Sequence, residues 1–446
     1  MIYDVIVGGA GPAGICAAIA AKRGGAKVLL IEDTAILGGT NTLSLVGPLM
    51  TYHNQGNPII GGIAAEIIER LKRVKGTLGH LEDPLGFCST VTPIDTEALK
   101  KLYFDMIVEY DIDLLLHTKI IHTIVEEGTI QAVTIANKSG VSNQYAKVFI
   151  DATGDGDLAT SAGAKYHIGR DSDQLCQPMT MPFVVGNVDL NQLKKAMQDE
   201  PNNFVLSNKY DFQYIGISGF FKEVQQAKAN YDFNIQRDRV LLFENVRTNE
   251  VTINMTRVLK HSALDAQSLT KAEIEGRKQI EETFQFLKQY IPGFEQSYIV
   301  QTPYQIGVRE TRHMICDYMM TKEDVLEHRQ FSDAICVSAF PMDIHSPVGA
   351  ALEVDDNSKE NHLAFEIPLR CLLPKGLTNL IVTGRMIGAT HEAAASLRVS
   401  PVCMALGEAA GVLGALSIQE NIDIRQVSYQ DVAVQLKNYH QILKYQ

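Results

Sequence analysis

The first 33 residues alternate between apolar runs and glycine-rich turns. Residues 5–7 and 28–31 are uninterrupted apolar runs of the length of a buried strand, and residues 13–23 between them are mostly small. Continuous apolar runs are typical of strands that are covered on both faces of a parallel sheet. The pattern therefore predicts a strand, a turn, a helix and a second, parallel strand.

The spacing of apolar residues changes in the later part of the chain, first at residue 113 and again at residue 165. Residues 113–150 contain short alternating runs between turns, which predict a strand and a small antiparallel meander. Residues 148–151 and 380–383 read as further buried strands, and each ends at a glycine turn. Residues 165–370 mix strand-like and helix-like pieces without such turns, and residues 269–290 predict a long amphipathic helix.

The turn after the first predicted strand has the spacing G-x-G-x-x-G, at Gly9, Gly11 and Gly14. Gly9 permits the tight turn, Gly11 lets a pyrophosphate approach the backbone, and Gly14 lets the helix pack closely on the strand. Glu32 ends the second strand, where a carboxylate accepts hydrogen bonds from a ribose. The motif therefore predicts a bound dinucleotide, and by itself it leaves NAD and FAD open.

Length and composition argue mainly against certain partners and sites. A chain of 446 residues is longer than one ordinary core, so two lobes are expected. The formal net charge of −12 argues against nucleic acid as a partner. The seven cysteines form no C-x-x-C pair and the twelve histidines show no metal-ligand spacing, so no metal is expected. The chain shows no uncharged apolar run of about 18 residues and no N-terminal signal, which predicts a cytoplasmic protein without a membrane contact.

Three further motifs extend the glycine pattern. The second strand is followed by Gly38-Gly39-Thr40-Asn41, the strand at 148–151 by ATGDGD, and the C-terminal part reads NLIVTGR…THEAAASLRVSPVCMALGEAAG. Together with the first motif and Glu32, they resemble the FAD-dependent oxidoreductase family, distantly related to the flavoproteins of fumarate reductase and succinate dehydrogenase. The resemblance covers residues 1–165 and about 375–420, and an NAD dehydrogenase would show the first motif alone.

The resemblance implies an α/β fold. A Rossmann-like FAD-binding domain, with a central parallel sheet, an antiparallel β-meander and flanking helices, would comprise residues 1–165 and 375–446. Residues 166–374 would form an inserted mixed α+β substrate or cap domain. The FAD would be noncovalent, because no His or Cys stands at the loop positions from Thr40 to Ser44 where relatives attach it.

The resemblance also implies which residues bind FAD. These are Gly9, Gly11, Pro12, Ala13, Gly14, Glu32, Asp33, Gly39, Thr40, Asn41, Ile120, Thr153, Gly154, Asp155, Asp157, Gly384, Arg385, Ser400 and Pro401. Relatives carry an acid where Arg385 stands, so its contact stays open, with the pyrophosphate as one alternative. Ser400 as N-cap and Pro401 as the first helical residue predict a helix whose positive end stabilises the negative charge of reduced flavin.

Three residues are candidates for substrate chemistry. Arg398 resembles in placement the arginine with which relatives hold a substrate carboxylate, and the alternative is a loop arginine bonded to Glu392 or to carbonyls. His391 is a candidate proton donor or carboxylate ligand, against a histidine that only stabilises the loop. Arg309 is a candidate second anion clamp, although a structural ion pair between the lobes is the favoured reading. His345 and His53 are weaker candidates.

The predicted activity is hydride transfer between flavin N5 and a small organic substrate. The reaction is either dehydrogenation or C=C reduction, and a substrate that bears a carboxylate is one alternative. The chain has no second G-x-G-x-x-G, so electrons would come from the substrate, from free NAD(P)H or from a protein donor. Two alternatives stay open: an FAD protein that modifies a macromolecule such as tRNA, and a non-catalytic flavin-binding protein. The sequence indicates neither the substrate nor the oligomeric state.

Overall fold

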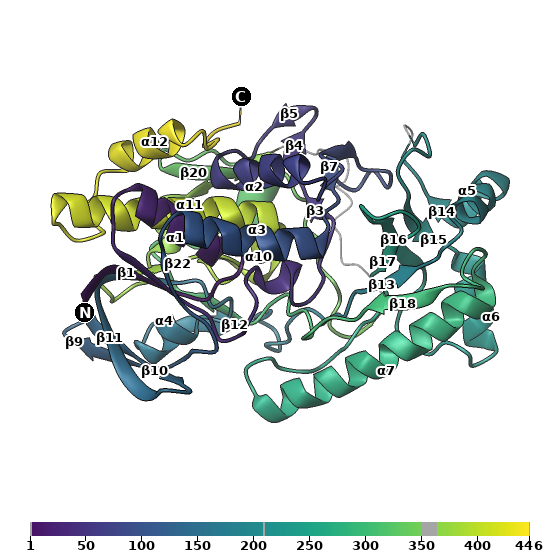
Figure 1. Cartoon of the computed structure of the whole chain (residues 1–446), viewed down its shortest axis with the longest axis horizontal. Coiled ribbons are helices and arrows are strands. Elements are labelled where there is room, and N and C mark those ends of the chain that lie inside the picture. Colours follow the sequence, from purple (N-terminus) through teal and green to yellow (C-terminus); the bar gives the residue numbers. More distant parts are fainter. Residues whose placement is uncertain (1, 208–209, 350–363, 446) are drawn as a thin grey trace.

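The protein is described by a computed structural model over residues 2–207, 210–349 and 364–445 (Figure 1). Two sheets organise these residues. In Figure 1 the sheet that contains β1, β11 and β22 lies on the left with helices α1 and α11, and the second sheet lies on the right above the long helix α7.

The first sheet has seven strands in the order β8-β2-β1-β11-β10-β9, with β22 also paired to β11. The β8, β2, β1, β11 and β22 pairings are parallel, and β9, β10 and the first half of β11 form an antiparallel meander. The predicted α/β class with a parallel core is therefore confirmed. The strands are β1 (Ile2–Gly8), β2 (Val28–Ile31), β8 (Asp113–Leu115), β9 (Lys119–Glu126), β10 (Thr129–Asn137), β11 (Gly140–Asp151) and β22 (Leu380–Val382).

Helix α1 (Pro12–Arg23) packs directly on helix α11 (Ser400–Glu420) because their contact is lined by small residues. A Cβ built on Gly407 would lie only 2.7 Å from the carbonyl carbon of Ala13, so glycine is required there. By length and composition α11 is apolar enough to cross a membrane, but 89% of its apolar window is buried inside the protein. Burial of that extent is what a helix in the core of a folded domain shows.

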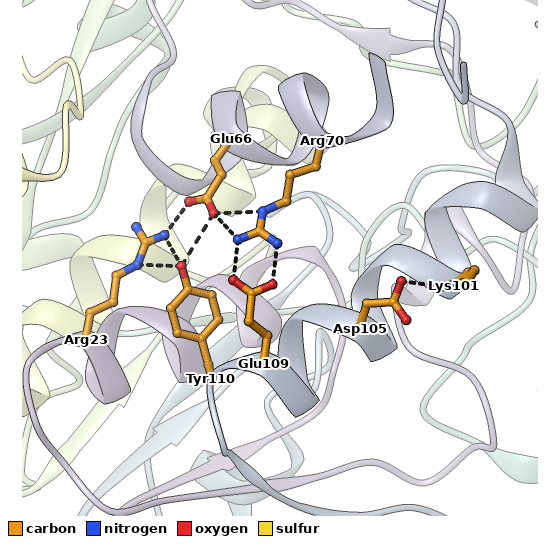
Figure 2. A network of polar contacts seen from close by, with 7 residues as sticks. All are labelled: Arg23, Glu66, Arg70, Lys101, Asp105, Glu109 and Tyr110. Carbon is orange, nitrogen blue, oxygen red and sulfur yellow. Dashed lines mark hydrogen bonds and ion pairs between the residues drawn. The ribbon is translucent and has the colours of Figure 1, made fainter. Parts of the chain in front are cut away.

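A network of ion pairs joins α1 to α2 (Gly62–Arg73) and α3 (Thr96–Glu109) at the surface (Figure 2). Glu66 accepts hydrogen bonds from Arg23 and, at 2.9 Å, from Arg70 Nε. Arg70 also reaches Glu109, with Nη1 2.6 Å from Oε2. Side chains of alternating charge therefore connect the three helices. Tyr110, just after α3, completes the network by accepting a hydrogen bond from Arg23 Nε.

The second sheet is antiparallel and has six strands in the order β14-β15-β16-β17-β13-β18. Helix α7 (Ala266–Tyr290) covers a core that includes Phe183, Phe233 and Phe286, and it contains the helix predicted over residues 269–290. The strands are β13 (Phe183–Gly186), β14 (Phe204–Val205), β15 (Gly216–Gly219), β16 (Val240–Glu244), β17 (Val251–Ile253) and β18 (Tyr298–Gln301).

The buried side chains of the second core end at Ile306, and later ones such as Ile335 and Phe365 belong to the core around α1 and α11. The division of the chain at residues 165 and 375 stays a prediction. The other elements are η1 (Gly39–Asn41), β3 (Leu49–Met50), β4 (His53–Asn54), β5 (Asn57–Pro58), β6 (Leu81–Glu82), β7 (Thr90–Thr92), α4 (Asp157–Ser161), β12 (Tyr166–Ile168), α5 (Leu190–Asp199), η2 (Pro201–Asn203), α6 (Phe221–Ala229), β19 (Arg312–Met314), α8 (Lys322–Leu326), β20 (Ala334–Ser338), β21 (Phe365–Pro368), η3 (Leu369–Leu372), α10 (His391–Leu397) and α12 (Tyr429–Asn438).

Candidate functional site

The glycine turns that follow β1, β11 and β22 lie together at the carboxyl ends of these parallel strands. A Cβ built on Gly9 would lie 2.8 Å from the Cα of Thr153, and one built on Gly384 would lie 3.4 Å from the Cβ of Ala13. Gly9 and Gly384 have φ values of 90° and 88°, a region that favours glycine. Open α/β folds bind their ligands at this edge of the sheet. The structure thus brings three distant glycine motifs to one place.

The N-terminus of α1 fits a phosphate group. Gly11 is the N-cap residue without a side-chain hydrogen bond, and a Cβ built on it would meet no heavy atom of the described residues within 4 Å. A Cβ built on Gly14 would instead overlap the carbonyl oxygen of Gly9. Uncapped N–H groups beside backbone without a Cβ are the donors that phosphate oxygens need. The residues present therefore fit the FAD pyrophosphate, and the roles of Gly11, Pro12 and Ala13 toward it remain predictions.

Glu32 is held firmly at the end of β2. Its Oε2 accepts the N–H of Ala10 at 2.7 Å, and its Oε1 accepts the N–H and the hydroxyl of Thr34 at 2.9 and 2.8 Å. Asp33 is exposed and lies 3.9 Å from Lys119 Nζ. Ile120 Cδ1 lies over the end of β1, 2.8 Å from a Cβ built on Gly8. Glu32 therefore lies against the first glycine turn, and Ile120 lies beside the last residue of the strand that leads into it.

The turn after β11 is organised by a buried carboxylate. Asp151 Oδ1 accepts the N–H and the hydroxyl of Thr153 at 2.9 and 2.7 Å, and Oδ2 accepts the N–H of Ala159. Burial raises the pKa of Asp151 to about 6, against these hydrogen bonds. Asp157 instead faces outward and pairs with Arg312, with Nη1 3.0 Å from Oδ1. Asp151 thus stabilises the turn that presents Gly154 and Asp155.

Arg385 contacts this same turn. Its Nη2 lies 2.6 Å from Asp155 Oδ1, and a Cβ built on Gly154 would lie 3.0 Å from its guanidinium carbon. Thr311 donates its hydroxyl to the same oxygen of Asp155 at 2.7 Å. The partner of Arg385 in the structure is therefore Asp155, and a contact with the pyrophosphate remains a prediction.

The start of α11 differs from the predicted cap. Ser400 is the first helical residue and Val399 takes the N-cap position, without a side-chain hydrogen bond. The prediction of Ser400 as N-cap is wrong because Val399 has the extended backbone of the N-cap residue, and the Ser400 hydroxyl accepts a hydrogen bond from Asn41 Nδ2 at 3.0 Å. Asn41 follows Gly39 and Thr40 in the short helix η1, so this bond joins the second glycine loop to α11. Pro401 follows inside the first turn, whose N–H groups have no side-chain cap.

His391 lies at the start of α10 and is 5% exposed. Its Nδ1 lies 2.7 Å from Glu310 Oε1, and His313 Nε2 lies 2.9 Å from the same oxygen. Burial lowers the pKa of His391, but the hydrogen bond and the charge of Glu310 outweigh it and raise the pKa overall. Glu392, the next residue, forms no hydrogen bond to His391 or Arg398 within the described residues; the partner of His391 is Glu310. His391 is therefore a buried histidine with an oriented ring.

Arg398 connects α10 to the start of α11. Its Nη2 lies 3.2 Å from Asp343 Oδ2, 3.1 Å from Asp343 O and 3.3 Å from Gln177 Oε1. Arg309 Nη1 donates to the carbonyl of Pro178 at 2.7 Å, a contact that is not the ion pair favoured from the sequence. Burial first, and then Arg398, lower the pKa of Arg309 well below its usual range. The two candidate arginines therefore lie close enough to repel each other.

Two more arginines lie near Arg398 and Arg309, one just before β16 and one just after β17. Arg237 is 6% exposed and Arg257 is 2% exposed. Arg257 Nη1 lies 3.3 Å from His345 Nδ1, and His345 Nε2 lies 3.0 Å from Asp343. A guanidinium only donates, so Nδ1 of His345 is the acceptor and its Nε2–H donates to Asp343. Burial lowers the pKa of His345 to about 3, which keeps this histidine neutral.

Gln177 lies between the two groups of candidate residues. Its backbone N–H donates to Glu310 Oε2 at 2.8 Å, and its side-chain Oε1 accepts from Arg398 and from the N–H of His345, both at 3.3 Å. Both partners are donors, so the amide orientation is fixed and Nε2 points elsewhere. That Nε2 is buried and has no hydrogen-bond partner within the described part of the chain.

We name Arg237, Arg309 and Arg398 the basic cluster. Asp343 is a mostly buried carboxylate that acts on all three guanidinium groups, and Arg398 Nη2 lies 3.2 Å from its Oδ2. Burial raises the pKa of Asp343, but His345, Arg398 and Arg309 lower it more. Among the described residues, Arg237, Arg309 and Arg398 therefore face one shared, mostly buried carboxylate, and an anionic ligand beside them would be stabilised.

Sequence reasoning missed Gln177, Arg237, Arg257, Asp343 and the role of Glu310. Their neighbours in the sequence carry no motif, and only the meeting of four separate segments gives them a shared site. Among the described residues, no group of three or more His, Cys, Asp or Glu side chains is placed to hold a metal.

The chain is similar to several solved structures at low identity. The flavin-dependent brominase Bmp2 is 12% identical with a TM-score of 0.49, over 99% of this chain and 83% of that chain. A geranylgeranyl bacteriochlorophyll reductase-like protein from Thermoplasma acidophilum is 12% identical with a TM-score of 0.47, over 98% and 83%. The p-nitrophenol 4-monooxygenase PnpA from Pseudomonas putida DLL-E4 is 10% identical with a TM-score of 0.47, over 97% and 83%.

No match was found among the curated proteins. A family model does match, however, and it spans residues 4–436, so it includes every glycine turn and every arginine described above. The match agrees with the site, where the uncapped start of α1 and the open backbone at Gly11 fit a nucleotide phosphate. The chain belongs to the FAD dependent oxidoreductase family, and it is an oxidoreductase with FAD as its cofactor.

Proposed function

We propose that this oxidoreductase transfers a hydride between FAD and a small organic substrate that bears an anionic group. The observation that carries the proposal is the basic cluster, in which Arg237, Arg309 and Arg398 interact with one mostly buried carboxylate, Asp343. Guanidinium groups held close together repel each other, and an anionic ligand between them would relieve that repulsion.

The first glycine turn, η1 and the start of α11 would hold the FAD. When bound, FAD supplies a two-electron centre that accepts or donates a hydride. The chain contributes three uncapped or glycine-lined backbone segments that bind and orient it. The positive end of α11 favours negative charge beside it, which makes a reduced flavin easier to form. The loop from Thr40 to Ser44 has no residue for covalent attachment, so acid denaturation should release the flavin.

Arg398 and Arg309 are proposed to bind the anionic group of the substrate. Arg398 immediately precedes Val399 and Ser400, so its position is tied to the start of α11. Its Nη2 is engaged by Asp343 and Gln177, which orients the planar guanidinium without neutralising the whole cluster. Gln177 Nε2 has no hydrogen-bond partner among the described residues and would donate to an acceptor on the ligand. Dehydrogenation and C=C reduction are both compatible with this arrangement.

The test is anaerobic reduction or oxidation of the bound flavin by a panel of small carboxylates, each paired with its uncharged amide. We expect one acid to change the visible flavin absorbance and its amide to react at least about ten-fold more weakly. Arg398→Ala should lose this discrimination and keep its FAD. Arg277→Ala, on the surface of α7, serves as the matched control. Equal reaction of acid and amide in the unmodified protein would overturn the proposal.

A further inference from the structure

Glu310 is a buried carboxylate with three donors and no role in the proposed function as stated. It is 3% exposed. Its Oε1 lies 2.7 Å from His391 Nδ1 and 2.9 Å from His313 Nε2, and its Oε2 accepts the N–H of Gln177 at 2.8 Å. A carboxylate only accepts when ionised, and burial of its charge is balanced here by these donors. Although burial raises it, the pKa of Glu310 falls to about 2 through His313 and His391.

The contact with Glu310 decides which nitrogen of His391 is free. Because the carboxylate accepts, Nδ1 of His391 must carry a hydrogen in both protonation states. Only Nε2 then gains and loses a proton. A histidine that is oriented by a carboxylate through one nitrogen, and that exchanges a proton through the other, is the arrangement required of a general acid or base.

Other charged groups face this pair from each neighbouring segment. His313 shares Glu310 Oε1 and stacks on His167, with ring centroids 5.0 Å apart. Glu392 of α10 raises the pKa of His391, whereas Arg170 lowers it. Two residues of the loop after β12 also interact with the pair. Arg170 and then His391 lower the pKa of Asp173, and burial and then Glu310 raise the pKa of Cys176. None of these groups bonds to His391 in the described chain, so Glu310 is its dominant partner.

The pair is connected to the basic cluster through one residue. Gln177 donates its backbone N–H to Glu310 and accepts from Arg398 with its side chain. His391 and Arg398 also occupy the first position of α10 and the position just after its end. An anion held by Arg398 is therefore near the same short helix that carries His391, and the two functions can act on one substrate.

We propose that Glu310 is a positioning residue that fixes the proton on His391 Nδ1, so that His391 Nε2 exchanges a proton with the substrate during hydride transfer. In C=C reduction, a hydride with its electron pair passes from reduced FAD to one carbon, and the proton of Nε2–H goes to the other. His391 then becomes neutral. In dehydrogenation both movements are reversed, and Nε2 accepts the proton. The inference rests on the proposed function and adds to it the source of the proton.

The first test needs no substrate. Histidine side chains of the ¹⁵N-labelled holoenzyme are titrated by NMR, with His391→Asn to assign the signal. We expect Nδ1 of His391 to stay protonated throughout and Nε2 to titrate. Glu310→Gln keeps an accepting oxygen but removes the charge, so the midpoint should shift to lower pH. Glu310→Asp keeps the charge and should restore the midpoint. A midpoint unchanged in Glu310→Gln would overturn the proposal.

The second test follows flavin reduction or oxidation against pH with the reactive carboxylate from the panel above. The midpoint of the rate profile should shift to lower pH in Glu310→Gln and should be restored in Glu310→Asp. His313→Asn removes the second donor but leaves Glu310 to His391, so its profile should keep the His391 midpoint or move it higher. A shift by NMR without a shift in the rate profile would overturn proton exchange by His391, while the result with Arg398→Ala would still judge the proposed function separately.

Discussion

The guanidinium of Arg385 lies 2.6 Å from the carboxylate of Asp155, Nη2 to Oδ1, and this pair ties the turn after β22 to the turn after β11. The two side chains are 18% and 25% exposed. Thr311 adds a hydrogen bond to the same oxygen at 2.7 Å, so a third segment meets at Asp155. One ion pair therefore connects two glycine turns that are more than two hundred residues apart in the sequence.

Breaking this pair should loosen the site and the fold together. Arg385→Ala and Asp155→Ala should each lower the free energy of unfolding by about 1–2 kcal/mol, between the values for exposed and buried pairs. A double-mutant cycle followed by urea unfolding should give a coupling of about 1 kcal/mol. The matched control is the more exposed pair Arg239 and Asp238, where the coupling should stay below about 0.5 kcal/mol. Zero coupling between Arg385 and Asp155 would contradict the expected role.

Gly11 and Gly14 should respond differently to alanine. A Cβ at Gly14 overlaps the carbonyl oxygen of Gly9, so Gly14→Ala should destabilise the protein whether or not FAD is bound. A Cβ at Gly11 meets no heavy atom of the described residues within 4 Å, so Gly11→Ala should fold normally. It should nevertheless bind FAD at least about ten-fold more weakly, since the methyl group occupies the approach of the pyrophosphate. Melting of the apoprotein and FAD titration separate the two effects, and normal FAD affinity in Gly11→Ala would exclude this position for the pyrophosphate.

The parallel strands and glycine turns were predictable because their signals are local. A strand followed by a turn is visible in a few consecutive residues, as an apolar run that ends in a glycine. Gly9 and Gly384 are two such glycines, and both have a positive φ. The basic cluster was not predictable, because Arg237 and Asp343 meet only through tertiary folding. Ser400 shows that a local signal can also mislead. Serine before proline is a good N-cap signal, yet Val399 is the N-cap residue, and the Ser400 hydroxyl accepts a hydrogen bond from Asn41, 359 residues away in the sequence.

Arg237 should matter for anion binding and not for stability. Within the described part of the chain, its guanidinium donates to the carbonyls of Met255 and Asn254, both at 3.3 Å, and burial together with Arg257 lowers its pKa to about 10. Arg237→Met removes a buried charge while keeping most of the volume, so stability should stay equal or rise. Binding of malonate, followed through the flavin absorbance, should weaken by at least about ten-fold.

Arg239 offers the matched control for that experiment. It pairs with Asp238 at 2.8 Å and lies over the ring of Phe221, and its side chain is 30% exposed. Arg239→Met removes the same charge two residues away from Arg237 and should change malonate binding by less than about two-fold. Equal effects of both substitutions would mean that the general electrostatic field, and not Arg237, attracts the anion.

The helix network of Figure 2 should contribute to stability in a salt-dependent way. Glu66 is 26% exposed and faces both Arg23 and Arg70, so Glu66→Gln leaves two guanidinium groups without their shared carboxylate. The free energy of unfolding should fall by about 1 kcal/mol at low salt, and by less at about 1 M salt. Asp105→Asn removes the exposed pair with Lys101 and should cost less than about 0.5 kcal/mol. Urea titrations at both salt concentrations would decide, and a loss that does not depend on salt would point to packing instead.

Glu408 should make the stability of the protein depend on pH. It is fully buried in the middle of α11, where its Oε2 accepts the N–H of Ile63 at 2.8 Å and so caps α2 from another helix. Its Oε1 has no hydrogen-bond partner among the described residues. Burial raises the pKa of Glu408 to about 8, and the hydrogen bond from Ile63 only partly opposes it. Glu408 is thus protonated in the folded state at neutral pH, whereas an unfolded chain has already lost this proton at about pH 4.5.

The sign of the effect follows from the proton count. Between about pH 4.5 and 8 the folded state binds the extra proton, so stability falls as the pH rises through this window, by about 5 kcal/mol in total. Glu408→Gln cannot ionise and keeps an oxygen for Ile63, so its stability relative to the unmodified protein should increase steadily across the same window. Other titrating groups cancel in this difference, because they are shared by both proteins. Urea unfolding at several pH values measures it, with Glu420→Gln at the exposed end of the same helix as the control. Parallel curves for Glu408→Gln and the unmodified protein would show that Glu408 is already ionised in the folded state, and that α2 begins on a charged cap.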